Sequence, residues 1–570
     1  MLKRPAGNCS GRSDWPESPA RRAFLGRIQV ALGALSVPAL GMRGLCSQTA
    51  GNDAIAKTIH GRVRGAHRDG VIVFKGLPYA GSPAGENRFK PAPKLSPWTG
   101  IRDALVYGPQ AIQPADPAWP KEWTPAVSDE DCLFLNVWTQ SIGKGRKRPV
   151  MFYSHGGGFA TGNGGADVPP QDTMHDGAAL ARDYDVVVVT HNHRLGLMGY
   201  LYLGHLLGEE YAASGSAGMS DIAAALQWVR DNIGEFGGDP DRVMIWGESG
   251  GGAKTSTLTA LPRARGMFHR ASIESGSTLR LRTRESAIET TGAVLDALGL
   301  TGKQARDLLK IPAEKLCAAQ REIPGRKPAS SASVTSALAE GLGFSPVVDG
   351  HFIPAHPYDP VAPAISANVP LLVGTNKDET IFMFRSTPEV FSMDEAGLRR
   401  KLEATYKERT ERILDVYHRT RPGASPADLY VAITTAQWMG MSAITMAERK
   451  AALKAAPVYM YVFAYETDGP VAPGVSYRMK AAHAMEIPYK FNNAGRDETE
   501  SNRAEKRRAS RNMSRAWAAF AATGNPSHDE IPPWPAYTLQ TRATMFLDAE
   551  CRVVNDPYGQ ERLLWKELKP

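Results

Sequence analysis

The chain has 570 residues, 42% of them hydrophobic and 22% charged, which is ordinary for a soluble globular protein that can bury a large core. Its 67 Lys and Arg against 59 Asp and Glu give a formal charge of +8, which is modest for this length. The basic runs 144–148 and 506–511 contribute much of that charge, and no zinc-ligand spacing, Walker loop or RNA-binding signature accompanies them. We therefore interpret both runs as solvated surface and exclude a nucleic-acid-binding function.

The first 50 residues have the pattern of an export signal. Arg21 and Arg22 precede a weakly apolar stretch, residues 28–40, that contains Gly and Pro. Paired arginines before such a stretch resemble a bacterial twin-arginine signal, and the stretch is too short to span a bilayer in the mature protein. We expect residues 1–50 to be removed on export to the periplasm or the exterior, and residues 51–570 to form one domain without a stable membrane anchor. The alternatives are a disordered basic leader or a mis-set start codon.

A glycine-rich segment follows a predicted buried strand. The apolar residues 150–153 predict this strand, which leads into His155-Gly156-Gly157-Gly158. Consecutive glycines let backbone amides approach a substrate oxygen without a side chain in the way, as in the oxyanion hole of a serine hydrolase. The alternative is a glycine-rich turn at a strand end. We interpret His155 as the start of this loop and not as a catalytic base.

The next two elements are a strand at 186–190 and a helix at 220–236. The helix carries Ile222, Leu226, Val229 and Ile233 on one stripe, the spacing of a helix face packed on a sheet. His191 and His193 follow the strand in a spacing that could ligate a metal, but a pair of structural histidines at a strand end is the preferred interpretation.

A short strand at 243–246 then enters Gly247-Glu248-Ser249-Gly250-Gly251, the pattern of a nucleophile elbow. The tight turn excludes bulky side chains on both sides of Ser249 and holds its hydroxyl out at the end of the sheet. The amide of Gly250 would complete the oxyanion hole. A glycine-rich serine turn can occur by chance, but two matching motifs in this order favour the catalytic interpretation.

Further strands are predicted at 371–374 and 458–462. Alternation of strands and helices, with continuously apolar strands, predicts an α/β fold whose mostly parallel central sheet has helices on both faces. The segments 278–344 and 387–456 are expected to be helical insertions around the active site.

The serine requires a histidine base and an acid that follow it in the chain. Thirteen histidines are present, and the residues alone do not choose among them. Asp378 and Glu379 follow the strand at 371–374, and Asp349 is a third candidate for the acid. Because Asp and Glu both serve in this position, chemistry leaves the three open.

From about residue 59 onward the chain resembles the type-B carboxylesterases, the cholinesterase-like group of α/β-hydrolases. The matching motifs are Gly76-Leu77-Pro78-Tyr79-Ala80, Ser128-Asp129-Glu130-Asp131-Cys132-Leu133, Asn192-His193-Arg194-Leu195-Gly196, Phe236-Gly237-Gly238-Asp239-Pro240, the elbow itself, and Gly524-Asn525-Pro526. The resemblance implies that the acid is Glu379, in Asn376-Lys377-Asp378-Glu379, and that the base is His483.

The chain also departs from that family. Gly250 stands where the family usually has Ala, which we expect to loosen the elbow slightly, and Thr380 and Ala484 replace glycines. The Gly-Pro-x-Cys context of the cysteine that normally pairs with Cys132 reads Gly108-Pro109-Gln110-Ala111 here, so Cys132 lacks that partner and we expect few or no disulfides.

The sequence thus predicts an exported serine esterase with an α/β-hydrolase fold and a small-molecule ester as its partner. Ser249, His483 and Glu379 are its predicted triad, and Gly157, Gly158 and Gly250 its predicted oxyanion donors. No metal and no organic cofactor is expected. The alternative is a non-catalytic binding or adhesion protein of the same fold.

Overall fold

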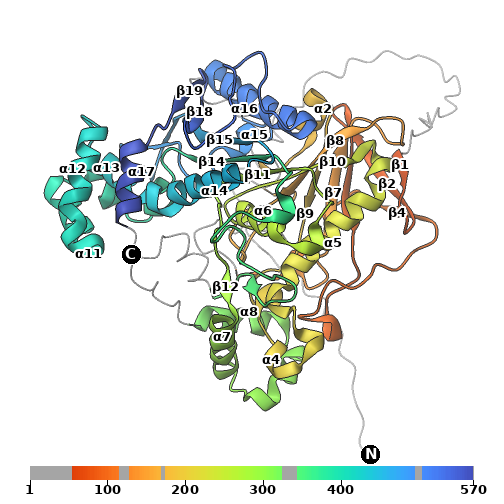
Figure 1. Cartoon of the computed structure of the whole chain (residues 1–570). Coiled ribbons are helices and arrows are strands. Elements are labelled where there is room, and N and C mark those ends of the chain that lie inside the picture. The colour runs from red at the N-terminus through yellow and green to blue at the C-terminus, as the bar shows by residue number, and fades with distance from the viewer. Residues whose placement is uncertain (1–53, 115–126, 169–173, 324–342, 495–502, 569–570) are drawn as a thin grey trace, which may run out of the picture. The chain divides into compact units, whose positions relative to one another are not determined.

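The computed structural model describes residues 54–114, 127–168, 174–323, 343–494 and 503–568 (Figure 1). The predicted export signal lies outside these residues. A 13-stranded sheet forms the centre of the described fold. In spatial order its strands are β1 (Ala54–Lys57), β2 (Arg62–Arg68), β3 (Val71–Pro78), β7 (Phe134–Thr139), β9 (Val187–His191), β8 (Arg148–Ser154), β10 (Gly238–Glu248), β11 (Arg270–Glu274), β14 (Leu371–Asn376), β15 (Val458–Phe463), β18 (Ala543–Leu547) and β19 (Arg552–Asn555), with β4 (Ile101–Asp103) beside β2.

The strands from β9 to β18 are parallel, whereas the pairs at both edges are antiparallel except for the parallel pair of β2 and β4. The three remaining strand pairs are β5 (Gln110–Ala111) with β6 (Ser128–Asp129), β12 (Arg282–Thr283) with β13 (Val347–Val348), and β16 (Thr467–Pro470) with β17 (Arg478–Lys480). The helices are α2 (Ala178–Tyr184), α3 (Gly196–Tyr200), α4 (Gly204–Leu207), α5 (Ala217–Asn232), α6 (Gly250–Ala260), α7 (Arg284–Ala297), α8 (Ala313–Glu322), α10 (Ile381–Phe384), α11 (Glu395–Tyr406), α12 (Thr410–Thr420), α13 (Pro426–Thr435), α14 (Met441–Ala452), α15 (Ile487–Lys490), α16 (Arg503–Thr523) and α17 (Gly559–Glu567).

The central strands are apolar throughout because both faces of the sheet are covered. Along β8, Val150 and Phe152 belong to the core that α5 covers, and Met151 and Tyr153 belong to the core that α16 covers. This alternation follows from the two-residue period of a strand. The parallel central strands and the two cores confirm the prediction of a mostly parallel sheet with helices on both faces.

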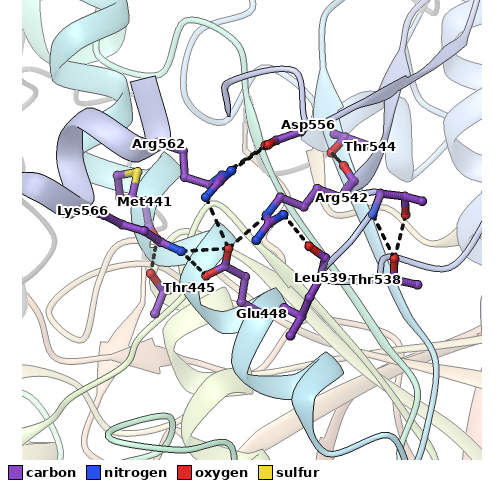
Figure 2. Close-up of polar contacts among 11 residues, drawn as sticks. Met441, Thr445, Glu448, Thr538, Leu539, Arg542, Thr544, Asp556, Arg562 and Lys566 are labelled. Atoms are coloured by element: carbon purple, nitrogen blue, oxygen red, sulfur yellow. Dashed lines mark hydrogen bonds and ion pairs between the residues drawn. The ribbon is translucent and has the colours of Figure 1, made fainter. Parts of the chain in front are cut away.

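The two predicted insertions are helical in their described parts (Figure 1). The first contains α7 and α8, and the second contains α11 to α14. A polar cluster joins the second insertion to the C-terminal helix (Figure 2). There the carboxylate of Glu448 in α14 accepts from Arg542 at 3.2 Å and from Lys566 of α17 at 2.8 Å.

We interpreted both basic runs as solvated surface, and this interpretation is wrong for one residue of the run 144–148. Arg148 is buried at the start of β8, where its guanidinium pairs with Asp185. Arg148 is therefore part of the buried structure, whereas residues 144–147 are exposed.

Candidate active site

Ser249 lies in the sharp turn between β10 and α6. Its backbone has φ 56° and ψ −121°, a strained conformation for a residue with a side chain. The flanking glycines are required by contact, since a Cβ on Gly247 would lie 2.5 Å, and one on Gly251 2.0 Å, from the backbone oxygen of Ser154. The turn leaves Ser249 partly exposed between buried neighbours, as a nucleophile elbow requires.

The glycine loop after β8 packs directly against this turn. Gly157 and Gly158 have φ values of 79° and 60°, which favour glycine. A Cβ on Gly250 would lie 2.2 Å from the oxygen and 2.4 Å from the nitrogen of Gly158. This close contact differs from our expectation that Gly250 would loosen the elbow slightly. The missing side chain of Gly250 lets the loop approach closely.

The backbone amides of Gly157, Gly158 and Gly250 donate no hydrogen bond to any described residue. Gly157 is exposed, and Gly158 partly so. Unengaged amides on adjoining backbone segments are the donors that a developing oxyanion needs.

His483 and Glu379 come together from different parts of the chain. The Nδ1 atom of His483 lies 2.6 Å from Oε2 of Glu379, and both side chains are buried. The other oxygen of Glu379 accepts from Ser275 Oγ at 2.6 Å and from the amide of Asn376 at 2.8 Å. These donors fix the carboxylate under the imidazole.

The two other candidate acids point elsewhere. Asp378 pairs with Lys377 at 3.0 Å and accepts from the amide of Ala481. One oxygen of Asp349 accepts three consecutive backbone amides, those of residues 351–353. Asp378 thus helps to fix the segment that leads into His483, and Asp349 fixes its own loop, but neither carboxylate contacts the imidazole among the described residues.

The other nitrogen of His483, Nε2, lies 3.3 Å from Oε1 of Glu248, the residue that precedes the serine. Within the described chain, no hydrogen bond joins His483 to Ser249. Burial alone would lower the pKa of His483, but Glu248 and Glu379 outweigh it and raise the pKa. Burial also raises the pKa of Glu248. The imidazole is thus held between two carboxylates.

Aromatic rings enclose the imidazole. Trp438 lies in a π-helical segment (Ala436–Gly440) between α13 and α14. The centroid of its ring is 4.7 Å from the centroid of the His483 ring. Phe382 of α10 lies 5.8 Å from it. Such π-helical segments are frequent at functional sites. Sequence analysis identified neither these residues nor Ser275, Asn376 or Glu248.

The departures from the family have distinct consequences. Thr380 is buried and its hydroxyl bonds to Thr434 at 2.8 Å, which ties the loop of Glu379 to α13. Ala484 has φ 68°, a left-handed conformation that a glycine adopts without strain. Cys132, Cys317 and Cys551 are free, and Cys9 and Cys46 lie outside the described residues.

His155, His191 and His193 form a buried group beside the glycine loop, in which the rings of His155 and His193 are 4.8 Å apart. Burial lowers the pKa of all three. Among the described residues, no group of three or more His, Cys, Asp and Glu side chains has a metal-binding arrangement.

Comparison with known proteins agrees with this geometry. The model of the carboxylesterase family matches residues 52–565. This chain belongs to the carboxylesterase family. The carboxylesterase is 34% identical to para-nitrobenzyl esterase of Bacillus subtilis over 513 residues, which cover 89% of this chain and 97% of that protein. It is 32% identical over 551 residues to fumonisin B1 esterase of Sphingopyxis macrogoltabida, with 93% of each chain covered.

Solved structures show the same relationship. A carboxylesterase from Geobacillus stearothermophilus superposes with a TM-score of 0.75 at 35% identity, covering 90% of this chain and 100% of that one. The carboxylesterase described here is therefore a carboxylic-ester hydrolase with the α/β-hydrolase fold. None of its described helices has the length and apolar character needed to cross a bilayer.

Proposed function

We propose that this carboxylesterase cleaves esters through a Ser249–His483–Glu379 triad and an acyl-enzyme intermediate. The observation that carries the proposal is the strained turn at Ser249, which faces three unengaged glycine amides. A nucleophile beside preorganised donors is the arrangement that acyl transfer needs.

In the first half-reaction, Ser249 Oγ attacks the ester carbonyl carbon and His483 Nε2 takes its proton. The amides of Gly157, Gly158 and Gly250 bind the resulting oxyanion. Glu379 accepts from Nδ1 and stabilises the imidazolium charge, the role of the acid in such triads. The intermediate then collapses, the C–O bond to the alcohol breaks, and His483 returns its proton to the leaving oxygen.

In the second half-reaction, water gives its proton to His483 and attacks the acyl carbon. When this second intermediate collapses, the bond between the acyl carbon and Ser249 Oγ breaks, His483 returns the proton to Oγ, and the carboxylic acid is released. In this scheme Nε2 moves from Glu248 toward Ser249 when substrate is present, since catalytic hydrogen bonds often tighten only in the complex.

The variant Ser249→Ala tests the proposal with p-nitrophenyl acetate as substrate. Turnover should fall about a million-fold, the loss measured for a triad serine in a related mechanism, and a fluorophosphonate probe should no longer label the protein. Ser366→Ala is the matched control, because Ser366 is buried and its hydroxyl has no partner in the described structure. Turnover of Ser249→Ala within about tenfold of wild type would contradict the mechanism.

We also propose that residues 1–50 direct export through the twin-arginine pathway, on the basis of Arg21, Arg22 and the apolar stretch after them. Replacing both arginines by lysine should leave esterase activity in the cytoplasm. Unchanged periplasmic activity in a host with an intact pathway would exclude this signal.

A further inference from the structure

Lys254 is a fully buried lysine in α6, five residues after Ser249. Its Nζ atom donates to the backbone oxygen of His155 at 2.8 Å. No ion pair joins it to a carboxylate in the part of the chain that the structure describes. Because burying an ammonium group without a counter-ion is costly, the stability of the fold alone does not account for a lysine here.

The groups around Lys254 come from three strands. His155 follows β8, His191 and His193 lie at the end of β9, and Glu248 ends β10. Burial, and after it the charge of Lys254, lowers the pKa of all three histidines. Burial lowers the pKa of Lys254 to about 7, and the field of Glu248 opposes this change. The amine and the ammonium form both carry N–H donors, so either can hold the His155 oxygen.

The two carbonyls that begin the glycine loop are each bound by a side chain. Lys254 holds the oxygen of His155, and Nδ1 of the His155 ring lies 2.8 Å from the oxygen of Gly156. A trans peptide is planar, so its N–H points opposite to its carbonyl. Holding the Gly156 oxygen therefore directs the amide of Gly157 away from the His155 ring, and holding the His155 oxygen fixes the peptide before it.

We propose that Lys254 is a positioning residue of the oxyanion hole. By holding the His155 carbonyl it sets the start of the glycine loop, so that the amides of Gly157 and Gly158 meet the oxyanion of the tetrahedral intermediate. The inference rests on the proposed function, because it assigns Lys254 a role in that same reaction.

The test replaces Lys254 by Met, which has nearly the same length but no donor and no charge. The kcat for p-nitrophenyl acetate should fall about ten- to a hundredfold with KM nearly unchanged, since a misplaced oxyanion donor acts mainly on the transition state. An aryl boronic acid, which forms a tetrahedral adduct with the serine, should bind more weakly by a similar factor. The melting temperature is measured beside kcat, because the substitution removes a buried cation and also leaves the His155 carbonyl without its donor.

Thr255→Val is the matched control, since Thr255 is the next residue of the same helix, is equally buried, and its hydroxyl has no partner among the described residues. It should keep wild-type kcat and boronic acid affinity. If Lys254→Met does not fold, Lys254→Gln, whose shorter side chain does not reach the same position, takes its place with the same expected losses.

A kcat for the folded variant within twofold of wild type would overturn the inference. So would a lower kcat with unchanged boronic acid affinity, because the oxyanion hole would then be intact. Either result is distinct from failure of the proposed function, which Ser249→Ala tests independently.

Discussion

Replacing Gly250 by Ala, the residue usual in the family that this chain resembles, should impair catalysis. The new Cβ would lie 2.2 Å from the oxygen of Gly158 and 2.4 Å from its Cα and nitrogen. Carbon contacts are favourable only near 3.5 Å, so the loop and the elbow must separate by about 1 Å. All three contacting atoms are backbone, and no side chain can rotate away to relieve the overlap.

The displaced atoms belong to the proposed oxyanion hole, so the loss should appear in the chemical step. A shift of 1 Å in a catalytic group costs about a hundredfold, and removal of one oxyanion donor costs about a hundred- to a thousandfold. We therefore expect kcat for p-nitrophenyl acetate to fall about a hundredfold, with a much smaller change in KM.

Gly292→Ala is the control for this substitution. Gly292 lies in α7, and an added Cβ there meets no atom within 4 Å. This variant should keep wild-type kcat and gain slightly in stability, because alanine is the better helix former. If Gly250→Ala keeps kcat within threefold of wild type, the close approach of the loop is not what aligns its amides.

Three further predictions concern the groups around His483. Glu379→Gln should lower kcat about ten-thousandfold, as loss of the acid does in a related triad, whereas Asp378→Asn and Asp349→Asn should keep most activity. An inactive Asp378→Asn beside an active Glu379→Gln would reassign the acid. Glu248→Gln should move the acidic limb of the kcat/KM profile to lower pH: the base must be neutral, and the variant loses a carboxylate that raises its pKa. A limb that stays in place or moves to higher pH would contradict this electrostatic role. Ala484→Gly should raise the free energy of unfolding by about 1 kcal/mol, since it removes a left-handed non-glycine residue. Urea denaturation measures this change, and a lower midpoint would show that Ala484 is unstrained.

Much of the fold and site could be predicted from sequence because the motifs encode backbone conformation. Gly247, Gly250 and Gly251 around Ser249, and Gly157 in the loop after β8, stand where a Cβ would collide with backbone. Such positions can be recognised in the amino-acid sequence because few residue types can occupy them. The choice of Glu379 over Asp378 and Asp349 could not be made in this way. It depends on which side chain meets the imidazole, and adjacent residues of a loop point in different directions.

The residues that sequence analysis missed act through contacts between distant segments. Ser275 reaches Glu379 from the end of another strand, the side-chain amide of Asn376 donates to the backbone oxygen of Ala482 beside His483, and Trp438 contacts His483 from a helical insertion. The local sequence around a serine, an asparagine or a tryptophan does not show which distant residue its side chain contacts. Their placement follows from the order of the strands in the sheet, which no single segment contains.

The burial of Lys254, by contrast, could have been predicted from the sequence of its helix. A lysine in a predicted helix is ordinarily solvated, but α6 reads Gly-Gly-Gly-Ala-Lys-Thr-Ser-Thr-Leu-Thr-Ala and has no acidic or other charged residue. A helix made mostly of small residues can pack closely against the elements around it. A long cationic side chain on such a helix is then covered by its neighbours and cannot reach solvent. The absence of any other charged residue in the helix that follows the nucleophile therefore indicates that its single lysine is buried beside the site, where a backbone carbonyl can accept a hydrogen bond from it.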